Sequence, residues 1–366
     1  MHITLSRMDL LQAVQRCQNI VERRHTVPIL SNILLNAEND ELVITATDLE
    51  VSIKTRGTGK VLQAGATTVA ARKLFDVLKE LDADADIDIQ LDQSFLNIKS
   101  GRSKFRLATM PADDFPDVQE DEESSSIHID GTDLAAMIAS TSFAMSTDET
   151  RKYLTGTLFE IDEQGRLNLA ATDGHRLALT RTSLEQQVNA SQNIVPRKTV
   201  MEIRKLCEDV SGQVTLNMSD RQIRLTAGAH NLTSKLIDAR FPSYEDVIPA
   251  NNPEIAVADR NGLDQILRRI MIVANEFTHD VRLQIKPGEL VVSSHNTEQE
   301  QAEETLELEY DGPETEIGFN ARYIRDVLGV MHNNTVRICL KDGLSPVLLK
   351  EDADSAASFV IMPMRI

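Results

Sequence analysis

The residues best suited to chemistry stand together at positions 173–176, in the order Asp-Gly-His-Arg. A carboxylate, an imidazole and a guanidinium could serve as an acid, a base and an anion clamp, which would make the chain an enzyme. Asp and Gly are equally typical of a turn, and here they follow an alternating apolar run that predicts a strand. No Gly-x-Ser-x-Gly elbow, phosphate-binding loop or metal-ligand cluster accompanies them. We therefore prefer the turn and keep an enzyme as the alternative.

The three cysteines do not suggest a disulfide or a metal site. Cys17, Cys207 and Cys339 are far apart, odd in number and without a Cys-x-x-Cys pair. This pattern favours neither a disulfide framework nor a zinc site. We expect buried thiols that behave as small apolar side chains, and no metal or cofactor.

The Asp-containing segment belongs to an internal repeat. Residues 46–49 (ATDL) return as 171–174 (ATDG), 125 residues later, and more faintly as 294–297 (SHNT). Residues 69–73 (VAARK) return in the same way as 194–198 (IVPRK), with 318–322 (GFNAR) in the third place. Landmarks that recur in order at nearly one spacing predict three copies of one structural unit. Chance similarity among small domains is the alternative.

Each copy combines helical and strand patterns, so the predicted fold class is α+β. In the first copy, Leu10, Val14, Cys17 and Val21 have helical spacing, whereas residues 42–45 and 87–91 alternate as strands do. An acidic, Ser-rich stretch at 119–126 and a Pro-bounded one at 249–253 predict the linkers. The predicted domains are 1–122, 127–250 and 253–366, each with two helices packed on antiparallel sheets.

The net charge of −19 argues against a nucleic-acid partner, because DNA-binding proteins usually present a basic surface. The distribution of charge answers this objection. Helical segments carry many of the cations, namely Arg16, Arg23, Arg24, Arg72, Lys73, Lys79, Arg197, Lys198, Arg204, Lys205, Arg268, Arg269, Arg322 and Arg325. Helices arranged around a hole would form a positive bore that contacts phosphates without reading sequence. Ordinary solvated helix faces are the bland alternative.

Two segments of opposite charge suggest how such a ring could close. Residues 99–106 place four cations in a strand-like pattern in the first copy, and residues 298–309 of the third copy carry six glutamates. Complementary edges favour head-to-tail association, which closes a ring if the rotation permits. Charged edges that only prevent aggregation are the alternative.

With these residues in view, the whole chain resembles the bacterial sliding clamp family, the beta subunit of DNA polymerase III. The resemblance rests on residues 171–178 (ATDGHRLA), 194–198 (IVPRK), 240–244 (RFPSY), 318–320 (GFN) and 360–366 (VIMPMRI). It implies the DNA-clamp fold, a homodimeric head-to-tail ring of six similar domains, and a non-catalytic processivity factor for DNA replication. It also implies double-stranded DNA, the polymerase III alpha subunit, the clamp loader and other polymerases or repair proteins as partners.

The resemblance implies a cleft between the second and third domains, where partners dock a short apolar motif. The implied cleft residues are Leu154, Thr172, Gly174, His175, Arg176, Leu177, Pro242, Val247, Asn320, Tyr323, Val360, Met362, Pro363, Met364 and Arg365. Asp246 and Pro346 depart from better-known members, which have a basic residue and a serine there. This departure puts the charge at the rim of the cleft in question.

Two further residue sets come from the same resemblance. The implied DNA contacts are Arg24, Arg151, Lys152, Tyr153, Arg197 and Lys198. The implied dimer contacts are Lys73, Phe105 and Leu107 against Ile272, Val273, Glu298, Glu300 and Glu304.

A second alternative from another class is a scaffold that binds only proteins and never encircles DNA. The first residues have no signal-peptide pattern, and no stretch approaches the length of a membrane span. We therefore expect a cytoplasmic protein with no membrane partner.

Overall fold

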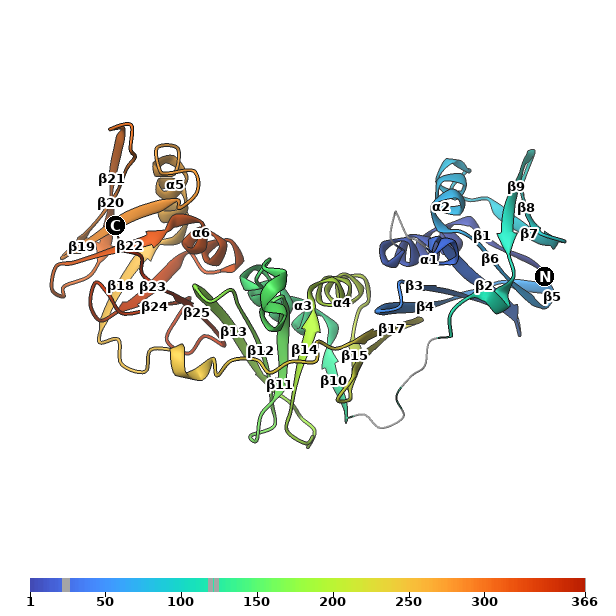
Figure 1. Cartoon of the computed structure of the whole chain (residues 1–366), viewed down its shortest axis with the longest axis horizontal. Helices are drawn as coiled ribbons and strands as arrows, with labels where there is room; N and C mark the ends of the chain where they lie inside the picture. Colours follow the sequence, from blue (N-terminus) through green and yellow to red (C-terminus); the bar gives the residue numbers. More distant parts are fainter. Residues whose placement is uncertain (22–26, 118–120, 122–124, 366) are drawn as a thin grey trace. The chain divides into compact units, whose positions relative to one another are not determined.

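The computed structural model describes residues 1–21, 27–117, 121 and 125–365. Its contacts divide the chain into two compact units (Figure 1). The first unit comprises Met1–Thr132 and Glu202–Leu236, and the second comprises Asp133–Met201 and Ile237–Ile366. The second repeat thus contributes to both units.

One antiparallel sheet lies in each unit. The sheet of the first unit has the order β10-β15-β16-β17-β4-β3-β2-β6-β9-β8-β7-β1-β5. Its strands, in chain order, are β1 (His2–Ser6), β2 (Asn32–Glu38), β3 (Glu41–Thr47), β4 (Val51–Thr58), β5 (Lys60–Gln63), β6 (Gly65–Ala70), β7 (Asp86–Asp92), β8 (Phe95–Ser100), β9 (Ser103–Met110), β10 (Ser125–Asp130), β15 (Gln213–Met218), β16 (Gln222–Ala227) and β17 (His230–Lys235).

The sheet of the second unit has the order β14-β11-β12-β13-β25-β24-β23-β18-β21-β20-β19-β22. Its strands are β11 (Gly156–Ile161), β12 (Arg166–Thr172), β13 (Arg176–Ser183), β14 (Ser191–Pro196), β18 (Glu254–Asp259), β19 (Asp280–Lys286), β20 (Glu289–His295), β21 (Gln301–Glu309), β22 (Thr315–Asn320), β23 (Thr335–Leu340), β24 (Val347–Lys350) and β25 (Ala357–Ile361).

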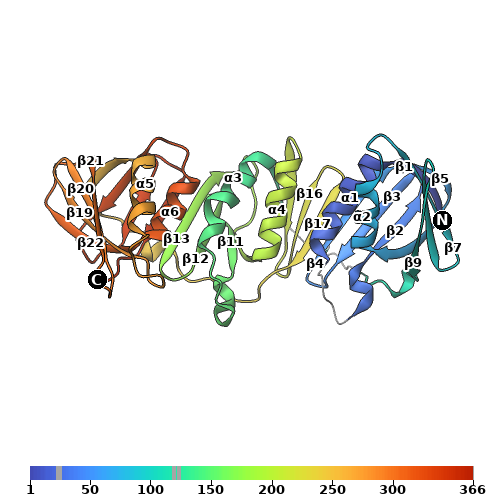
Figure 2. The same ribbon diagram turned by 90° about the horizontal axis from the view of Figure 1, so that it is seen from above.

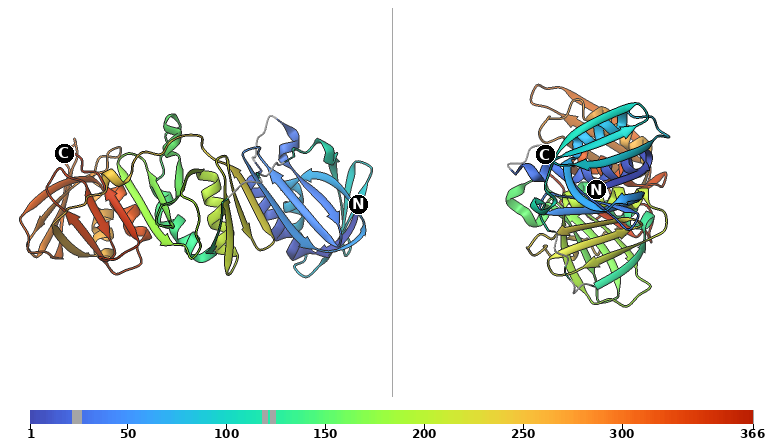
Figure 3. Two further views of the ribbon diagram at one scale, coloured as in Figure 1. Left: turned by 90° about the horizontal axis from the view of Figure 1, so that it is seen from below. Right: turned by 90° about the vertical axis from the view of Figure 1, so that its right-hand side faces the viewer.

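Two α-helices belong to each repeat, as expected: α1 (Arg7–Ile20) and α2 (Ala71–Glu80), α3 (Gly131–Thr141) and α4 (Arg197–Asp209), and α5 (Arg260–Ile270) and α6 (Ala321–Val330). In the first unit, α1 packs on α2 and on β3 and β4. Figure 2 shows these helices in front of the strands, and Figure 3 shows the opposite face, where the strands lie in front. In the second unit, α5 likewise packs on α6 and on β20 and β21.

Local sequence explains where these helices begin. Ser6 caps α1, because its hydroxyl accepts hydrogen bonds from the backbone N–H groups of Met8 and Asp9. Leu10, Val14 and Cys17 are buried at helical spacing, as predicted. The prediction that Val21 continues this stripe is wrong. The chain is extended there, and Ile20 takes the buried position instead.

The three repeats have similar turns, one residue wider in the third, as the internal repetition predicts. Asp48 Oδ1 accepts hydrogen bonds from the N–H groups of Glu50 (2.9 Å) and Val51 (2.7 Å). Asp173 Oδ1 does the same for His175 (2.9 Å) and Arg176 (3.1 Å). In the third repeat Asn296 Oδ1 accepts from the N–H groups of Glu298 (2.9 Å) and Glu300 (3.0 Å). The Asp-Gly pair therefore belongs to a structural turn that precedes a strand.

Strand pairing joins consecutive repeats inside each unit. In the first unit β4 pairs antiparallel with β17, with Ile53 opposite Leu232. In the second unit β13 pairs antiparallel with β25, with Leu177 opposite Val360 (Figure 1). The sheets thus continue from one repeat to the next. Both junctions use the strand that follows the shared turn.

Candidate functional site

The turn at residues 172–176 lies at the second strand junction and shapes the site. Thr172 Oγ1 donates to the carbonyl oxygen of Arg176 (2.6 Å) and accepts from the N–H of Gly174 (3.0 Å). Gly174 has a φ of 92°, and a Cβ there would come within 3.1 Å of the Arg151 guanidinium. A glycine at this place therefore avoids both backbone strain and a collision.

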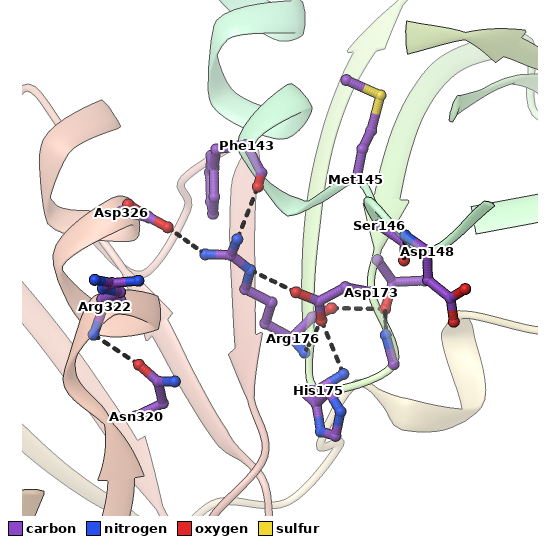
Figure 4. A network of polar contacts seen from close by, with 12 residues as sticks. Phe143, Met145, Ser146, Asp148, Asp173, His175, Arg176, Asn320, Arg322 and Asp326 are labelled. Carbon is purple, nitrogen blue, oxygen red and sulfur yellow. Dashed lines mark hydrogen bonds and ion pairs between the residues drawn. The ribbon is translucent and has the colours of Figure 1, made fainter. Parts of the chain in front are cut away.

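Arg176 is held on several sides in Figure 4. Its Nε donates to Asp173 Oδ2 (3.0 Å), its Nη1 to Asp326 Oδ2 (2.5 Å) and its Nη2 to the carbonyl oxygen of Phe143 (2.8 Å). The guanidinium carbon also lies 4.5 Å from the centre of the Tyr323 ring. Only 10% of the side chain is exposed. Asp173 and Arg176 are thus engaged with each other, which leaves neither as a free acid or anion clamp.

An apolar cavity of about 300 Å³, the docking cavity, opens beside this turn. It is lined by Arg151, Tyr153, Leu154, Thr172, Gly174, Arg176, Leu177, Pro242, Ser243, Tyr244, Val247, Val360 and Met362. Leu177 and Val360 belong to the buried core cluster beneath it, which also contains Phe241. A rigid apolar floor with a few polar groups at its edge suits a short apolar peptide segment.

Nine of the cleft residues implied by the resemblance line the docking cavity: Leu154, Thr172, Gly174, Arg176, Leu177, Pro242, Val247, Val360 and Met362. Tyr244 and Ser243 also line it and were missed. The Phe-Pro-x-Tyr run that contains them was the available signal. Arg151 and Tyr153 line it as well, although the resemblance implied that they contact DNA.

The other implied cleft residues lie on segments next to this cavity. The His175 ring stacks near Tyr323, with centroids 6.4 Å apart and planes 19° apart. The N–H of Met362 donates to the carbonyl oxygen of His175, and that of Met364 to Gly318. Asn320 caps α6 by accepting from the N–H of Arg322. Pro363 and Arg365 flank Met364 in this C-terminal segment.

Two exposed apolar residues near these segments were missed. Phe277 is 91% exposed and Leu344 is 76% exposed. The loop before β19 that carries Phe277 is tied to α6, since the N–H of Ala321 donates to the carbonyl oxygen of His279. The loop that carries Leu344 packs on β22, because a Cβ on Gly343 would meet the Glu316 carbonyl oxygen. Exposed apolar side chains on anchored loops extend the apolar surface.

Asp246 lies on a short acidic turn next to the docking cavity. Glu245, Asp246 and Val247 form a short 3-10 turn, in which Glu245 pairs with Arg181 (3.2 Å). Glu245 and Asp246 face a second, polar cavity of about 750 Å³, whereas Val247 faces the docking cavity. Burial raises the pKa of Tyr244, and its hydrogen bond to Glu160 raises it further. The Tyr244 hydroxyl therefore stays protonated and donates to Glu160.

The DNA contacts implied by the resemblance fall in one region of the second unit, except for Arg24, which lies outside the described residues. Arg151, Lys152 and Tyr153 form part of the 3-10 segment Glu149–Leu154. Arg197 Nη2 donates to the carbonyl oxygens of Met145 and Ser146, just before that segment. Arg151 Nε also donates to Asp148 (2.9 Å). Arg197 and Arg151 thus have structural partners.

Many of the other helical cations also have a carboxylate partner within their unit. Arg16 pairs with Asp209, Arg72 with Asp76, Arg204 with Glu208, Lys205 with Glu202, Arg268 and Arg325 with Asp264, and Arg269 with Glu304. Several of these pairs are exposed, and exposed ion pairs are worth only about 0–1 kcal/mol.

The cysteines are buried, as predicted. Burial raises the pKa of the Cys207 thiol to about 12, which disfavours the thiolate that reacts or binds metal. Across the described ranges, no three His, Cys, Asp or Glu side chains group as metal ligands do. In the same part of the chain, no helix is long and apolar enough to cross a membrane.

Comparisons with known proteins decide the family. Models of the DNA polymerase III beta subunit match in chain order: the N-terminal domain at residues 1–119, the central domain at 128–243 and the C-terminal domain at 245–365. The chain belongs to the DNA polymerase III beta subunit family. Beta sliding clamps from Pseudomonas putida and Caulobacter vibrioides are 42% and 40% identical to it, over the full length of both chains.

Solved structures agree with this assignment. A sliding clamp from Pseudomonas aeruginosa bound to griselimycin is 41% identical, covers all of both chains and superposes with a TM-score of 0.97. A clamp from Caulobacter crescentus gives a TM-score of 0.94 at 39% identity, again with full coverage. The chain is therefore a DNA sliding clamp of three clamp domains, and a non-catalytic processivity subunit, as the sequence resemblance implied. The enzyme alternative is wrong.

Proposed function

We propose that two copies of the chain close head to tail into a ring around duplex DNA, and that the ring tethers DNA polymerases through the docking cavity. The supporting observation is a pair of strands that have a free edge. By the internal repeat, β21 corresponds to β4 and β13, and β9 corresponds to β17 and β25. At the two junctions, β4 pairs with β17 and β13 pairs with β25. The strands β21 and β9 have no such partner from another repeat among the described residues.

Over most of their length, β21 and β9 have a partner on one side only among the described residues. β21 pairs with β20 from Gln301 to Glu307, and with β18 only at Leu308 and Glu309. β9 pairs with β8 from Ser103 to Ala108, and with β6 only at Thr109 and Met110. A strand edge of this kind is a template for pairing with another chain.

The side chains on these two strands suit each other. Lys104 and Arg106 are exposed on β9, and Glu303 and Glu307 are exposed on β21. Phe105 and Leu107 alternate with the β9 cations, and Ile272, near the end of α5, is 82% exposed. Lys73, Val273, Glu298 and Glu300 are the remaining implied contacts. Opposite charge on the rim and apolar side chains between favour a head-to-tail contact.

Glu304, one of the implied dimer contacts, is already paired with a cation of its own chain. Arg269 Nε and Nη2 bind its two carboxylate oxygens at 2.7 and 2.5 Å. This pair holds the pKa of the Glu304 carboxyl below its usual range. Glu304 therefore packs β21 against α5, and Glu303 and Glu307 are the freer acids for a second copy.

A ring would hold DNA by topology, with weak phosphate contacts. We propose that Lys198 contacts DNA phosphates, and that the helical cations paired with exposed carboxylates exchange those carboxylates for phosphates. Such contacts carry no sequence information, and released counterions make them sensitive to salt. The ring can then slide along the duplex. We place this protein in the cytoplasm, where the bacterial chromosome lies.

We further propose that the docking cavity binds short apolar motifs of the polymerase III alpha subunit, the clamp loader and other polymerases or repair proteins. Three observations support this: the apolar lining, the open mouth beside Val247 and Met362, and the exposed Phe277 and Leu344 nearby. Methionine is flexible and polarisable, so Met362 and Met364 suit a surface that several partners share.

A loading experiment tests the ring. The chain is incubated with clamp loader, ATP and nicked circular plasmid, and the DNA-bound fraction is isolated by gel filtration before and after linearisation. We expect retention on the circle and loss after a single cut, because a ring leaves only through a free end. Equal retention on both forms would contradict encirclement, and absence from both would favour a protein-only scaffold.

A further inference from the structure

Asp326 lies outside the implied cleft and does not line the docking cavity, yet it contacts a residue that does. It lies on α6, and its Oδ2 accepts from Arg176 Nη1 at 2.5 Å (Figure 4). Arg176 belongs to the second repeat and forms part of the cavity wall. The ion pair therefore connects α6 of the third repeat to the turn that shapes the cavity.

Tyr323 lies one helical turn before Asp326, so the two side chains lie on the same side of α6. The Tyr323 ring packs 4.5 Å from the Arg176 guanidinium carbon and also stacks near His175. Helix α6 thus holds Arg176 through a carboxylate and through an aromatic ring. Asn320, which caps the same helix, is bound to the N–H of Arg322.

The three acceptors of Arg176 are not equivalent. Asp173 belongs to the same turn, and the Phe143 carbonyl belongs to the same repeat. Asp326 alone among these acceptors belongs to the third repeat. Without its charge, Asp173 and Phe143 would still hold the guanidinium in the second repeat, but α6 would contact the guanidinium only through the Tyr323 ring. The setting of Tyr323 relative to the cavity wall would then be less defined.

We propose that Asp326 is a positioning residue for partner docking: its ion pair with Arg176 fixes Tyr323 and the cavity wall relative to each other before a peptide arrives. This inference rests on the proposed docking of apolar peptides in the cavity. Arg176 in the cavity wall belongs to the second repeat and Tyr323 to the third, so a peptide that contacts both gains affinity when they are already positioned relative to each other. Without the Asp326–Arg176 ion pair, Tyr323 and the cavity wall must become ordered relative to each other when the peptide binds, which lowers the affinity.

The test uses the full chain and a labelled synthetic peptide of eight residues, polar except for one Leu and one Phe. A matched peptide has Ala at both positions, and affinities are measured by fluorescence anisotropy. We expect Asp326→Asn to weaken binding of the Leu/Phe peptide about five- to tenfold, with a melting temperature close to that of the wild type. Asp326→Glu restores the carboxylate and should restore affinity to within about twofold.

Asp264→Asn is the matched control. Asp264 also binds α6, through Arg325 at 2.8 Å, but does not touch the docking cavity. We expect its removal to leave peptide affinity unchanged. The chain has four tyrosines, so ring resonances can be resolved by NMR and assigned with Tyr323→Phe. Asp326→Asn should shift the Tyr323 signals and leave the other three in place.

The outcomes separate this inference from the docking proposal. If the wild type binds both peptides equally, docking of apolar motifs in the cavity is wrong. If the wild type prefers the Leu/Phe peptide but Asp326→Asn binds it equally well, Asp326 has no positioning role. Equal weakening in Asp326→Glu and Asp264→Asn would indicate a general loosening of α6 and would also overturn the inference.

Discussion

Met362 and Val247 are half-exposed apolar side chains at the docking cavity, and their side chains contribute little to the core. We expect Met362→Ala to weaken binding of the Leu/Phe peptide about 5- to 30-fold, or about 1–2 kcal/mol, because a peptide would bury this side chain. The melting temperature should hardly change. Anisotropy and scanning calorimetry on the same samples measure both quantities.

Ile255→Ala provides the control for that substitution. Ile255 is 41% exposed, close to the 38% of Met362, and lies in the same unit but outside the cavity lining. It should bind peptide as the wild type does. A Met362→Ala chain with wild-type affinity would place the docked peptide elsewhere.

His230 makes the first junction sensitive to acid. It begins β17, contacts Thr55 on β4, and has a folded-state pKa near 4, lowered by burial and by Arg16, with Asp209 opposing. The unfolded chain has the higher pKa and binds the proton first as the pH falls. Stability that His230 contributes above about pH 6.5 is therefore lost between pH 6.5 and 4.

His230→Gln should accordingly flatten the fall in melting temperature between pH 7 and pH 4.5, measured by calorimetry. Other groups titrate in this range, so the quantity to compare is the wild-type slope minus the variant slope. Parallel curves for the two proteins would show that His230 does not govern this acid sensitivity.

At the scale of elements, the head-to-tail dimer that we propose depends on the free edges of β9 and β21. Glu303→Lys with Glu307→Lys should weaken the dimer at least tenfold in sedimentation, because lysines would then face Lys104 and Arg106. Substitutions at Glu303 and Glu307 test the strand edge more directly than substitutions at Glu300 and Glu304, because Glu304 is already paired with Arg269. Lys104→Glu with Arg106→Glu should disrupt the dimer in the same way.

Mixing the two double variants supplies the decisive comparison. Each should dimerise at least tenfold more weakly alone, yet together they should form a heterodimer in which the charges across the contact are opposite again. Glu289→Lys, on the neighbouring strand β20, controls for a change in net charge. Unchanged sedimentation of the Glu303 and Glu307 variant would refute the pairing of these edges.

Several strands and helices could be predicted from the pattern of apolar residues. The stretches at 42–45 and 87–91 alternate because one face of each strand is buried, and they lie within β3 and β7. Helical spacing located α1. The end of its apolar stripe was overestimated at Val21, because an apolar residue just beyond a helix has the same spacing as one inside it.

At the scale of the whole molecule, the repeat produces two junctions in the described part of the chain, and the cavities beside them have different linings. The first junction has the same turn, and a cavity of about 460 Å³ lies beside it. There the register places Ser52, Thr233 and Lys235 where the second junction has Leu177, Val360 and Met362. Hydroxyl and ammonium groups lose hydration in contact with an apolar side chain, so they disfavour an apolar motif.

We therefore expect one Leu/Phe peptide per chain, and two per ring, in calorimetric titration. Met362→Ala should lower the affinity without changing this stoichiometry. Two peptides per chain, with the second lost in Lys235→Glu rather than in Met362→Ala, would show that the first junction also docks apolar motifs.

Much of this protein follows from local information in the chain. The threefold repetition, the α+β class, the buried cysteines and the Asp-Gly turn are visible in residue spacing, because strand alternation, helix periodicity and turn chemistry act over a few residues. The family could be identified for the same reason, since strings such as residues 171–178 and 360–366 are continuous in sequence.

Contacts between distant residues depended on the tertiary structure. Residue spacing does not predict that Arg176 binds Asp326, which is 150 residues away in the sequence. It also does not predict that Arg197 donates to the carbonyl oxygens of residues 145 and 146. It likewise does not reveal that Glu304 is held by Arg269, or that Tyr153 and Arg151 face the docking cavity. The Arg176–Asp326 pair arises where strands of two repeats meet, and the others arise where helices and loops pack within one repeat, so the folded chain decides which side chains become neighbours.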